Sequence, residues 1–195
     1  MFKNDLSIQI LIELRDPCII GHQERVASLA SAIAGLMGFS HERIAGVHLA
    51  ATMHDIGKIY VPAETLNKPG GLREVELEMV RSHPRIGYEL LKKAHFPWPI
   101  PDIVLQHHER MDGSGYSQGL SGNEIALEAR ILAVADVVDA MQCLRSHRPA
   151  HSLKRILDEL CQNRGVLYDA DVVDACVTIV TEKHLSGGQD DPVKA

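Results

Sequence analysis

The sequence predicts an all-α fold. Apolar residues recur at three- and four-residue steps along most of the 195 residues, which is the period of a helix with one buried face. We find no internal repeat and no convincing alternation of apolar and polar residues that would indicate a strand. Hydrophobic residues make up 45% of the chain and aromatic residues only 4%, which favours a core of Ala, Leu, Ile and Val.

Length and charge restrict the organisation of the chain and its function classes. We expect a lead helix over residues 1–15, one main domain over residues 16–185 and a flexible tail over residues 186–195. A net charge of −6 argues against binding of nucleic-acid polymers, which needs a basic face. No apolar run reaches the ~20 residues of a membrane span, and the N-terminus does not resemble a signal peptide. The four cysteines lack paired spacing, so we expect a reduced cytoplasmic protein without a membrane partner.

The first half of the main domain predicts two long helices and a loop. The first helix runs over residues 21–37 and ends at Gly38, a residue suited to the left-handed position after a helix. The second runs over residues 40–56 and begins at Ser40, which can cap its N-terminus. Prolines and glycines then predict a loop over residues 57–71.

Shorter helices are expected in the middle of the chain. Residues 72–81 form a charged helix with one apolar side, and Pro84 suits the first turn of a helix that ends near residue 93. Three prolines predict the next loop, after which Asp102 can cap a helix that carries apolar residues towards Glu109. The glycine-rich residues 112–119 must form a loop.

Three further helices complete the domain. The most apolar one is expected over residues 123–144. The helices over residues 152–162 and 169–182 are interpreted as packing elements.

One segment carries the strongest chemical signal, namely Ala51-Thr52-Met53-His54-Asp55-Ile56-Gly57-Lys58. The apolar stripe of its helix continues onto His54, Asp55 and Lys58, so these side chains should face the core near the helix end. A buried carboxylate must be bonded, protonated or bound to a metal. A His-Asp pair by itself is more often a structural ion pair, and the rest of the chain has to decide.

Other histidines and a second carboxylate make a metal centre the better interpretation. Consecutive histidines at a helix end point about 100° apart, so both reach one ion only if it lies between them. A carboxylate midway along a buried helix is costly without a cation. Asp136 fits that buried position better than Asp139, which we expect on the more polar side of the same helix. An exposed position at a helix start remains the alternative for His22. Together the candidates suit two divalent metals bridged by Asp55: His22, His54, Asp55, His83, His107, His108 and Asp136.

The order of these motifs resembles the HD-GYP branch of the HD phosphohydrolases over about residues 16–183. It reads His, then His-Asp-Ile-Gly-Lys, His-Pro, His-His-Glu-Arg-Met-Asp-Gly-Ser-Gly-Tyr and Ala-Asp-Val-Val-Asp-Ala. The resemblance implies an HD-type helical bundle around a centre of two or three metals, often iron or manganese. It also implies hydrolysis of a cyclic dinucleotide, chiefly cyclic di-GMP, to linear pGpG and then GMP, in bacterial signal transduction.

The resemblance further implies roles for single residues. His22, His54, Asp55 and Asp136 would hold one metal, and Asp55 would bridge to a second metal held by His83, His107 and His108. Lys58 matches a phosphate-contacting lysine and is, with Asp55, the expected catalytic residue. Arg145 matches a substrate-contacting arginine. Lys68, beside a tight turn, can meet a phosphate or be merely solvated.

The chain departs from the family pattern at three places. Ser117 stands where the family has the proline of Gly-Tyr-Pro, which should loosen a surface loop that contacts no metal ligand but whose Tyr116 shapes the substrate site or a partner surface. Ser146-His147 replace a usual Pro-Tyr. Cys18 replaces the glutamate of three-metal members, and a buried, inert cysteine is the preferred interpretation over a thiolate ligand.

Two other function classes stay open at this point. A signalling module would bind a cyclic dinucleotide or a protein without turnover, but such modules usually lose ligands and this chain keeps all seven. A general HD nucleotidase would not need the second group of histidines. The short N-terminal lead has no room for a sensor, so three alternatives stay open: a stand-alone effector, a fragment, or input from a regulatory sensor, receiver or diguanylate-cyclase-type partner. A homodimer is a further alternative.

Overall fold

Helices account for the architecture of the described chain, which confirms the all-α prediction. The computed structural model describes residues 21–143 and 150–187, with side chains through residue 182, and over these residues the only strand-like feature is an isolated bridge between Arg164 and Tyr168. The predicted lead helix 1–15, Cys18, Arg145, Ser146-His147 and the tail from residue 188 lie outside the described residues. Within the described ranges, no helix combines the length and hydropathy needed to cross a membrane.

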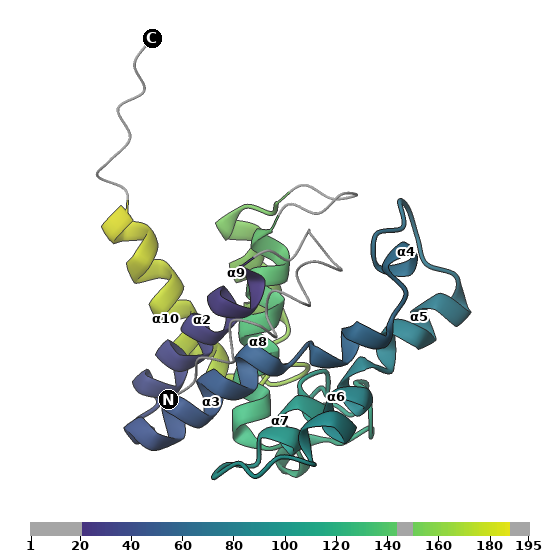
Figure 1. Cartoon of the computed structure of the whole chain (residues 1–195). Helices are drawn as coiled ribbons and strands as arrows, with labels where there is room; N and C mark the ends of the chain where they lie inside the picture. Colours follow the sequence, from purple (N-terminus) through teal and green to yellow (C-terminus); the bar gives the residue numbers. More distant parts are fainter. Residues whose placement is uncertain (1–20, 144–149, 188–195) are drawn as a thin grey trace.

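Figure 1 shows the helices of the described residues, most of them joined by short connections, with a longer loop over residues 107–121. They are α2 (His22–Leu36), α3 (His41–Met53), η2 (Ile56–Tyr60), α4 (Ala63–Leu66), α5 (Glu74–Arg81), α6 (His83–Leu91), α7 (Ile100–Gln106), η3 (Gly122–Glu124), α8 (Leu127–Gln142), α9 (Leu153–Gln162) and α10 (Ala170–Gly187). Ser40 and Ser152 cap α3 and α9, because each hydroxyl accepts from the backbone N–H three residues on.

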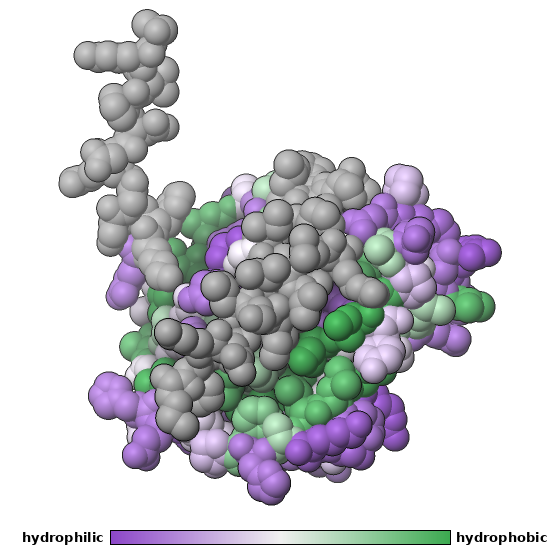
Figure 2. Space-filling model, in the orientation of Figure 1, coloured by the Kyte–Doolittle hydropathy of each residue, from purple (hydrophilic) through white to green (hydrophobic). Residues whose placement is uncertain are grey.

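The core lies where α2, α3, α7, α8 and α10 meet. Small residues such as Ala30 on α2 and Ala135 on α8 are fully buried and let the backbones approach, while Ile33 and Ile131 fill the space between. Each buried Ile contributes about 1.5–3 kcal/mol relative to an exposed one. In contrast, α4 and α5 project from the bundle, and the surface over them is mostly hydrophilic (Figures 1 and 2).

The structure differs from the sequence prediction at four places. The helix expected to run to Ile56 ends at Met53, and the loop predicted from Gly57 contains η2 and α4. The expected start near residue 123 is the short η3, after which α8 begins at Leu127. Asp102 lies in the first turn of α7 and does not cap it, since a helix tolerates proline in its first turn and α7 starts before Pro101.

Candidate metal centre

Three of the predicted ligands lie at helix C-termini, where backbone carbonyls have no partner in the next turn. His54 is the C-cap of α3, His107 is the C-cap of α7, and His83 follows the last turn of α5. The Nδ1 atoms of His54, His83 and His107 lie 2.6, 2.7 and 2.6 Å from the carbonyl oxygens of Ala51, Val80 and Val104. A carbonyl only accepts, so each Nδ1 donates and each Nε2 offers its lone pair to the interior.

His22 is held differently, because it begins α2. Its Nδ1 lies 2.6 Å from Oδ2 of Asp139, and its Nε2 lies 3.4 Å from Oδ1 of Asp136. Only 3% of the His22 surface is exposed, so the alternative of a solvated residue at the helix start is wrong. Asp139 is equally buried, which also corrects its placement on the polar side of α8.

All seven predicted ligands come together in three overlapping groups. Within each group the ligand atoms lie within 4.8 Å of one another: His22, His54 and Asp136; His83, His107 and His108; His54, Asp55 and His107. The Nε2 atom of His54 is buried and has no hydrogen-bond partner. A buried polar atom without a partner is costly, so this orphaned nitrogen fits a site built to receive a cation.

Asp55 lies between the first two groups. Its Oδ1 is 3.3 Å from Nε2 of His83, while its Oδ2 is 3.5 Å from Nε2 of His54. Burial would raise the pKa of Asp55, yet the cation of Lys58 and the neighbouring histidines hold that pKa well below its usual range. Asp55 is therefore an ionised carboxylate with one oxygen towards each group.

The two groups differ in protonation. Burial lowers the pKa of His83 to about 4 and that of His108 to about 3, and it also lowers the pKa of His107. These three imidazoles are neutral at pH 7 and suited to ligate a metal. Burial lowers the pKa of His22 as well, but its hydrogen bonds to Asp136 and Asp139 outweigh this effect and raise the pKa to about 9.

Lys58 lies beside Asp55, with its Nζ 2.7 Å from Oδ2. It extends from η2, which packs on the start of α6. A Cβ at Gly57 would lie 2.0 Å from the carbonyl oxygen of His83, so only glycine allows this contact. The glycine of His-Asp-Ile-Gly-Lys thus lets η2 bring Asp55 and Lys58 against His83.

The glycine-rich loop contacts the second group, contrary to the expectation of a loop without ligand contact. The ring of Tyr116 stacks on His108 with centroids 4.7 Å apart, and the Tyr116 N–H donates to the His108 carbonyl. A Cβ at Gly115 would lie 2.5 Å from backbone atoms of residues 108–110, which explains the glycine. The hydroxyl of Ser117 is buried without a hydrogen-bond partner.

Glu109, which the sequence prediction left without a role, anchors this loop. Its buried carboxylate accepts the backbone N–H groups of Gln118, Gly119 and Leu120 at 2.6, 3.3 and 3.1 Å. An ionised carboxylate is a strong acceptor for such a set of donors. Its place directly after two histidines was the only available signal in the sequence.

Lys68 does not join the histidine groups by any described contact. Its Nζ lies 2.6 Å from Oε2 of Glu76 on α5, in the projecting part of the fold.

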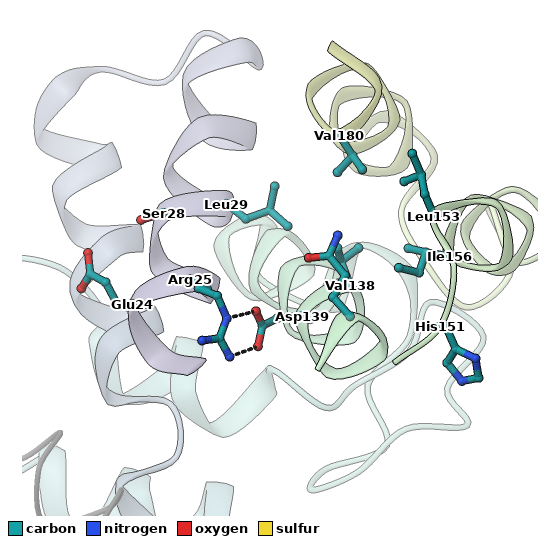
Figure 3. A pocket seen from close by; sticks show the side chains of 11 residues that line it. Glu24, Arg25, Ser28, Leu29, Val138, Asp139, His151, Leu153, Ile156 and Val180 are labelled. Atoms are coloured by element: carbon teal, nitrogen blue, oxygen red, sulfur yellow. Dashed lines mark hydrogen bonds and ion pairs between the residues drawn. The ribbon is translucent and has the colours of Figure 1, made fainter. Parts of the chain in front are cut away.

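A cavity of about 560 Å³ lies between α2, α8, α9 and α10. None of the seven candidate ligands lines it, but Arg25 and Asp139 do (Figure 3).

Comparison with known proteins decides the family. The model of the HD domain family matches residues 7–172. The chain belongs to the HD domain family. The resemblance inferred from the motif order is therefore confirmed.

The chain is similar in sequence to two curated cyclic di-GMP phosphodiesterases. It is 45% identical over 166 residues to the cyclic di-GMP phosphodiesterase response regulator RpfG of Xanthomonas campestris, covering 84% of this chain and 44% of the relative. It is 38% identical over 177 residues to a cyclic di-GMP phosphodiesterase of Thermotoga maritima, covering 90% and 48%. The chain thus spans about half the length of the curated relatives it matches.

A solved HD domain has the same fold. The crystal structure of the PgpH HD domain of L. monocytogenes in complex with cyclic-di-AMP superposes with a TM-score of 0.65. The match covers 96% of this chain and 100% of that domain at 21% sequence identity, a level that supports the fold alone.

Proposed function

We propose that this HD domain is a metal-dependent phosphodiesterase that hydrolyses a cyclic dinucleotide, cyclic di-GMP first, to linear pGpG, with GMP as the next product. The observation that carries the proposal is the position of Asp55, whose two carboxylate oxygens face two different histidine groups. The names of the similar relatives support cyclic di-GMP as the substrate. As in the sequence prediction, we place the activity in bacterial signalling in the cytoplasm.

The donor set fits two first-row divalent metals. His22, His54 and Asp136 would hold one ion, His83, His107 and His108 the other, and Asp55 would contribute to both. Imidazole and carboxylate donors accept iron and manganese among other first-row ions, and we propose these two ions from the resemblance to the HD-GYP branch. Bound there, the metals would supply Lewis-acid activation of the phosphodiester and of a water nucleophile.

The chain's own residues supply the remaining chemistry. Lys58 is 18% exposed beside a nearly inaccessible Asp55, so its ammonium can reach an arriving phosphate while it stays within the electrostatic field of the centre. Negative charge that develops on phosphate oxygens is stabilised best by such a fixed cation. Tyr116, stacked on His108 and half-buried, offers a ring edge and hydroxyl beside the second group for contact with the substrate.

Arg145 remains our proposed substrate contact on the basis of the family pattern. For Lys68, the ion pair with Glu76 supports a structural role more than a phosphate contact. We therefore use Lys68 as a control. A regulatory partner of the sensor, receiver or diguanylate-cyclase type, or a second copy of the chain, also remains a proposal.

The test uses the full chain purified without chelators and supplied with Mn²⁺ or Fe²⁺. Cyclic di-GMP, cyclic GMP-AMP, cyclic di-AMP and mononucleotides are incubated in parallel, and the products are separated by chromatography. Formation of pGpG that requires the metal supports the proposal. Binding of cyclic di-GMP without any product would identify a binding module, and cleavage of mononucleotides alone would identify a general nucleotidase.

A further inference from the structure

His22 needs a hydrogen-bond acceptor that its own helix cannot supply. His54, His83 and His107 use free carbonyls at helix C-termini for their Nδ1 atoms. His22 is the first residue of α2, and the free backbone groups at a helix N-terminus are N–H donors. The acceptor comes instead from α8, where Oδ2 of Asp139 lies 2.6 Å from the Nδ1 atom.

Asp139 is in turn held by Arg25, which lies one turn after His22 on α2. Arg25 Nε donates to Oδ1 of Asp139 at 2.6 Å, and Arg25 Nη2 donates to Oδ2 at 3.2 Å (Figure 3). Such a fork between a guanidinium and a carboxylate fixes both the position and the plane of the carboxylate. One turn of α2 thus carries both His22 and Arg25, and Arg25 orients the Asp139 carboxylate that accepts from His22.

The same fork distinguishes Asp139 from Asp136. Asp136 directs Oδ1 towards Nε2 of His22 and Nε2 of His54, at 3.4 and 3.9 Å, and belongs to the first ligand group. Asp139 instead meets the opposite nitrogen of His22 and the side chain of Arg25. The two carboxylates therefore act on opposite sides of one imidazole ring.

We propose that Asp139, oriented by Arg25, is a positioning residue that keeps the proton of metal-bound His22 on Nδ1 and turns the Nε2 lone pair into the ligand group. The inference rests on the proposed metal centre and concerns a residue outside its ligand set. Partners of this kind are typically worth 10–100-fold in metal affinity.

Asp139→Asn tests the inference with almost no change in shape. In the wild type, Oδ1 of Asp139 accepts from Nε of Arg25, while Oδ2 accepts from Nδ1 of His22 and from Nη2 of Arg25. An amide has a single acceptor oxygen, and when this oxygen faces the charged Nε of Arg25, the amide NH2 group faces Nδ1 of His22, so His22 loses its acceptor. In calorimetric titrations with Mn²⁺, one of the two sites should weaken about 10–100-fold while the other keeps its affinity.

The double variant Asp139→Asn/Arg25→Met separates positioning from mere packing. Without the guanidinium, the amide oxygen is free to accept from Nδ1 of His22, so a large part of the lost Mn²⁺ affinity should return. A purely structural pair would predict the opposite, because removal of both partners would add to the damage. No recovery in the double variant would overturn the role of Arg25 as competitor and of Asp139 as positioning residue.

Asp174→Asn is the matched control. Asp174 forms an exposed ion pair with Arg164, with the same guanidinium–carboxylate chemistry. This variant should bind Mn²⁺ as the wild type does. If the wild type binds two ions and Asp139→Asn binds them equally well, the positioning role alone is wrong. If the wild type binds no Mn²⁺, the proposed function fails and this inference fails with it.

Discussion

The two ligand groups of the candidate centre both contain buried histidines, but they differ in charge. The group of His22, His54 and Asp136 contains its own carboxylate, and His22 has its pKa raised to about 9. The group of His83, His107 and His108 consists of neutral imidazoles whose pKa values burial has lowered. Asp55 is the carboxylate within reach of both. The difference teaches that the second group depends on Asp55 for negative charge, whereas the first does not.

The strongest test of this contrast removes the shared carboxylate. In Asp55→Ala we expect no detectable phosphodiester hydrolysis and the loss of most Mn²⁺ binding at the second group, which then has no anionic ligand. Metal analysis by mass spectrometry and the chromatographic assay measure both effects. A variant that still holds two ions per chain, or a wild type that holds a single zinc ion elsewhere, would contradict the bridging role.

The next test concerns the cation beside the shared carboxylate. Lys58→Ala should keep the metals but lower turnover about 10²–10³-fold, the loss typical for one charge-stabilising group. Lys68→Ala is the matched control, since it also removes a lysine paired with a carboxylate but lies on the projecting α4–α5 part, and its turnover should stay unchanged. Equal turnover of Lys58→Ala and wild type at saturating substrate would leave Lys58 only the role of balancing Asp55.

We expect the Mn²⁺ affinities of the two groups to depend differently on pH, because a metal ion and a proton compete for the same ring nitrogen. The raised pKa of His22 means that the metal-free protein holds a proton there below about pH 9 and loses it as the pH rises through that value. Because a cation must displace this proton, Mn²⁺ affinity at the first group should rise about tenfold per pH unit between pH 6.5 and 8.5.

The second group is the internal control for that pH series. The pKa values of about 4 for His83 and about 3 for His108 leave these imidazoles neutral over the whole range, so Mn²⁺ affinity there should stay level. Calorimetric titrations at three pH values resolve the two sites. If the Mn²⁺ affinity rose equally with pH at both sites, the two groups would not differ in protonation.

The smallest expected effect concerns Ser117, in the loop that packs on the second group. Ser117→Pro removes a buried hydroxyl without a partner and restricts the unfolded chain, which should stabilise the fold by about 0.4–1 kcal/mol. We expect a rise in Tm of roughly 1–4 °C and a KM for cyclic di-GMP that improves a few-fold at constant kcat.

Ser117→Ala is the companion variant, because it removes the hydroxyl without restricting the backbone. If only the proline variant improves KM, the gain comes from the ordered loop around Tyr116. If Ser117→Pro instead creates activity in a wild type that has none, the unaltered domain is a binding module and the enzyme proposal is wrong.

Motif order and periodicity were enough to predict the all-α fold and the HD family, and they singled out seven candidate ligands that the structure brings together. The sequence could single out these residues because each lies at a helix end or on a buried helix face, and such positions follow from caps, apolar stripes and the spacing between motifs. The glycine at position 57 belongs to the same local pattern, although its reason is a contact with His83.

Only the tertiary structure decided which polar residues serve those ligands. Asp136 and Asp139 lie three residues apart on one helix, so periodicity cannot assign their roles; the partner of Asp139 is His22, 117 residues away. In the same way, the Glu109 carboxylate accepts from backbone N–H groups nine to eleven residues further along the chain, and Lys68 forms an ion pair with Glu76. A local pattern records burial and helix position, whereas a hydrogen bond between distant segments depends on how the helices pack.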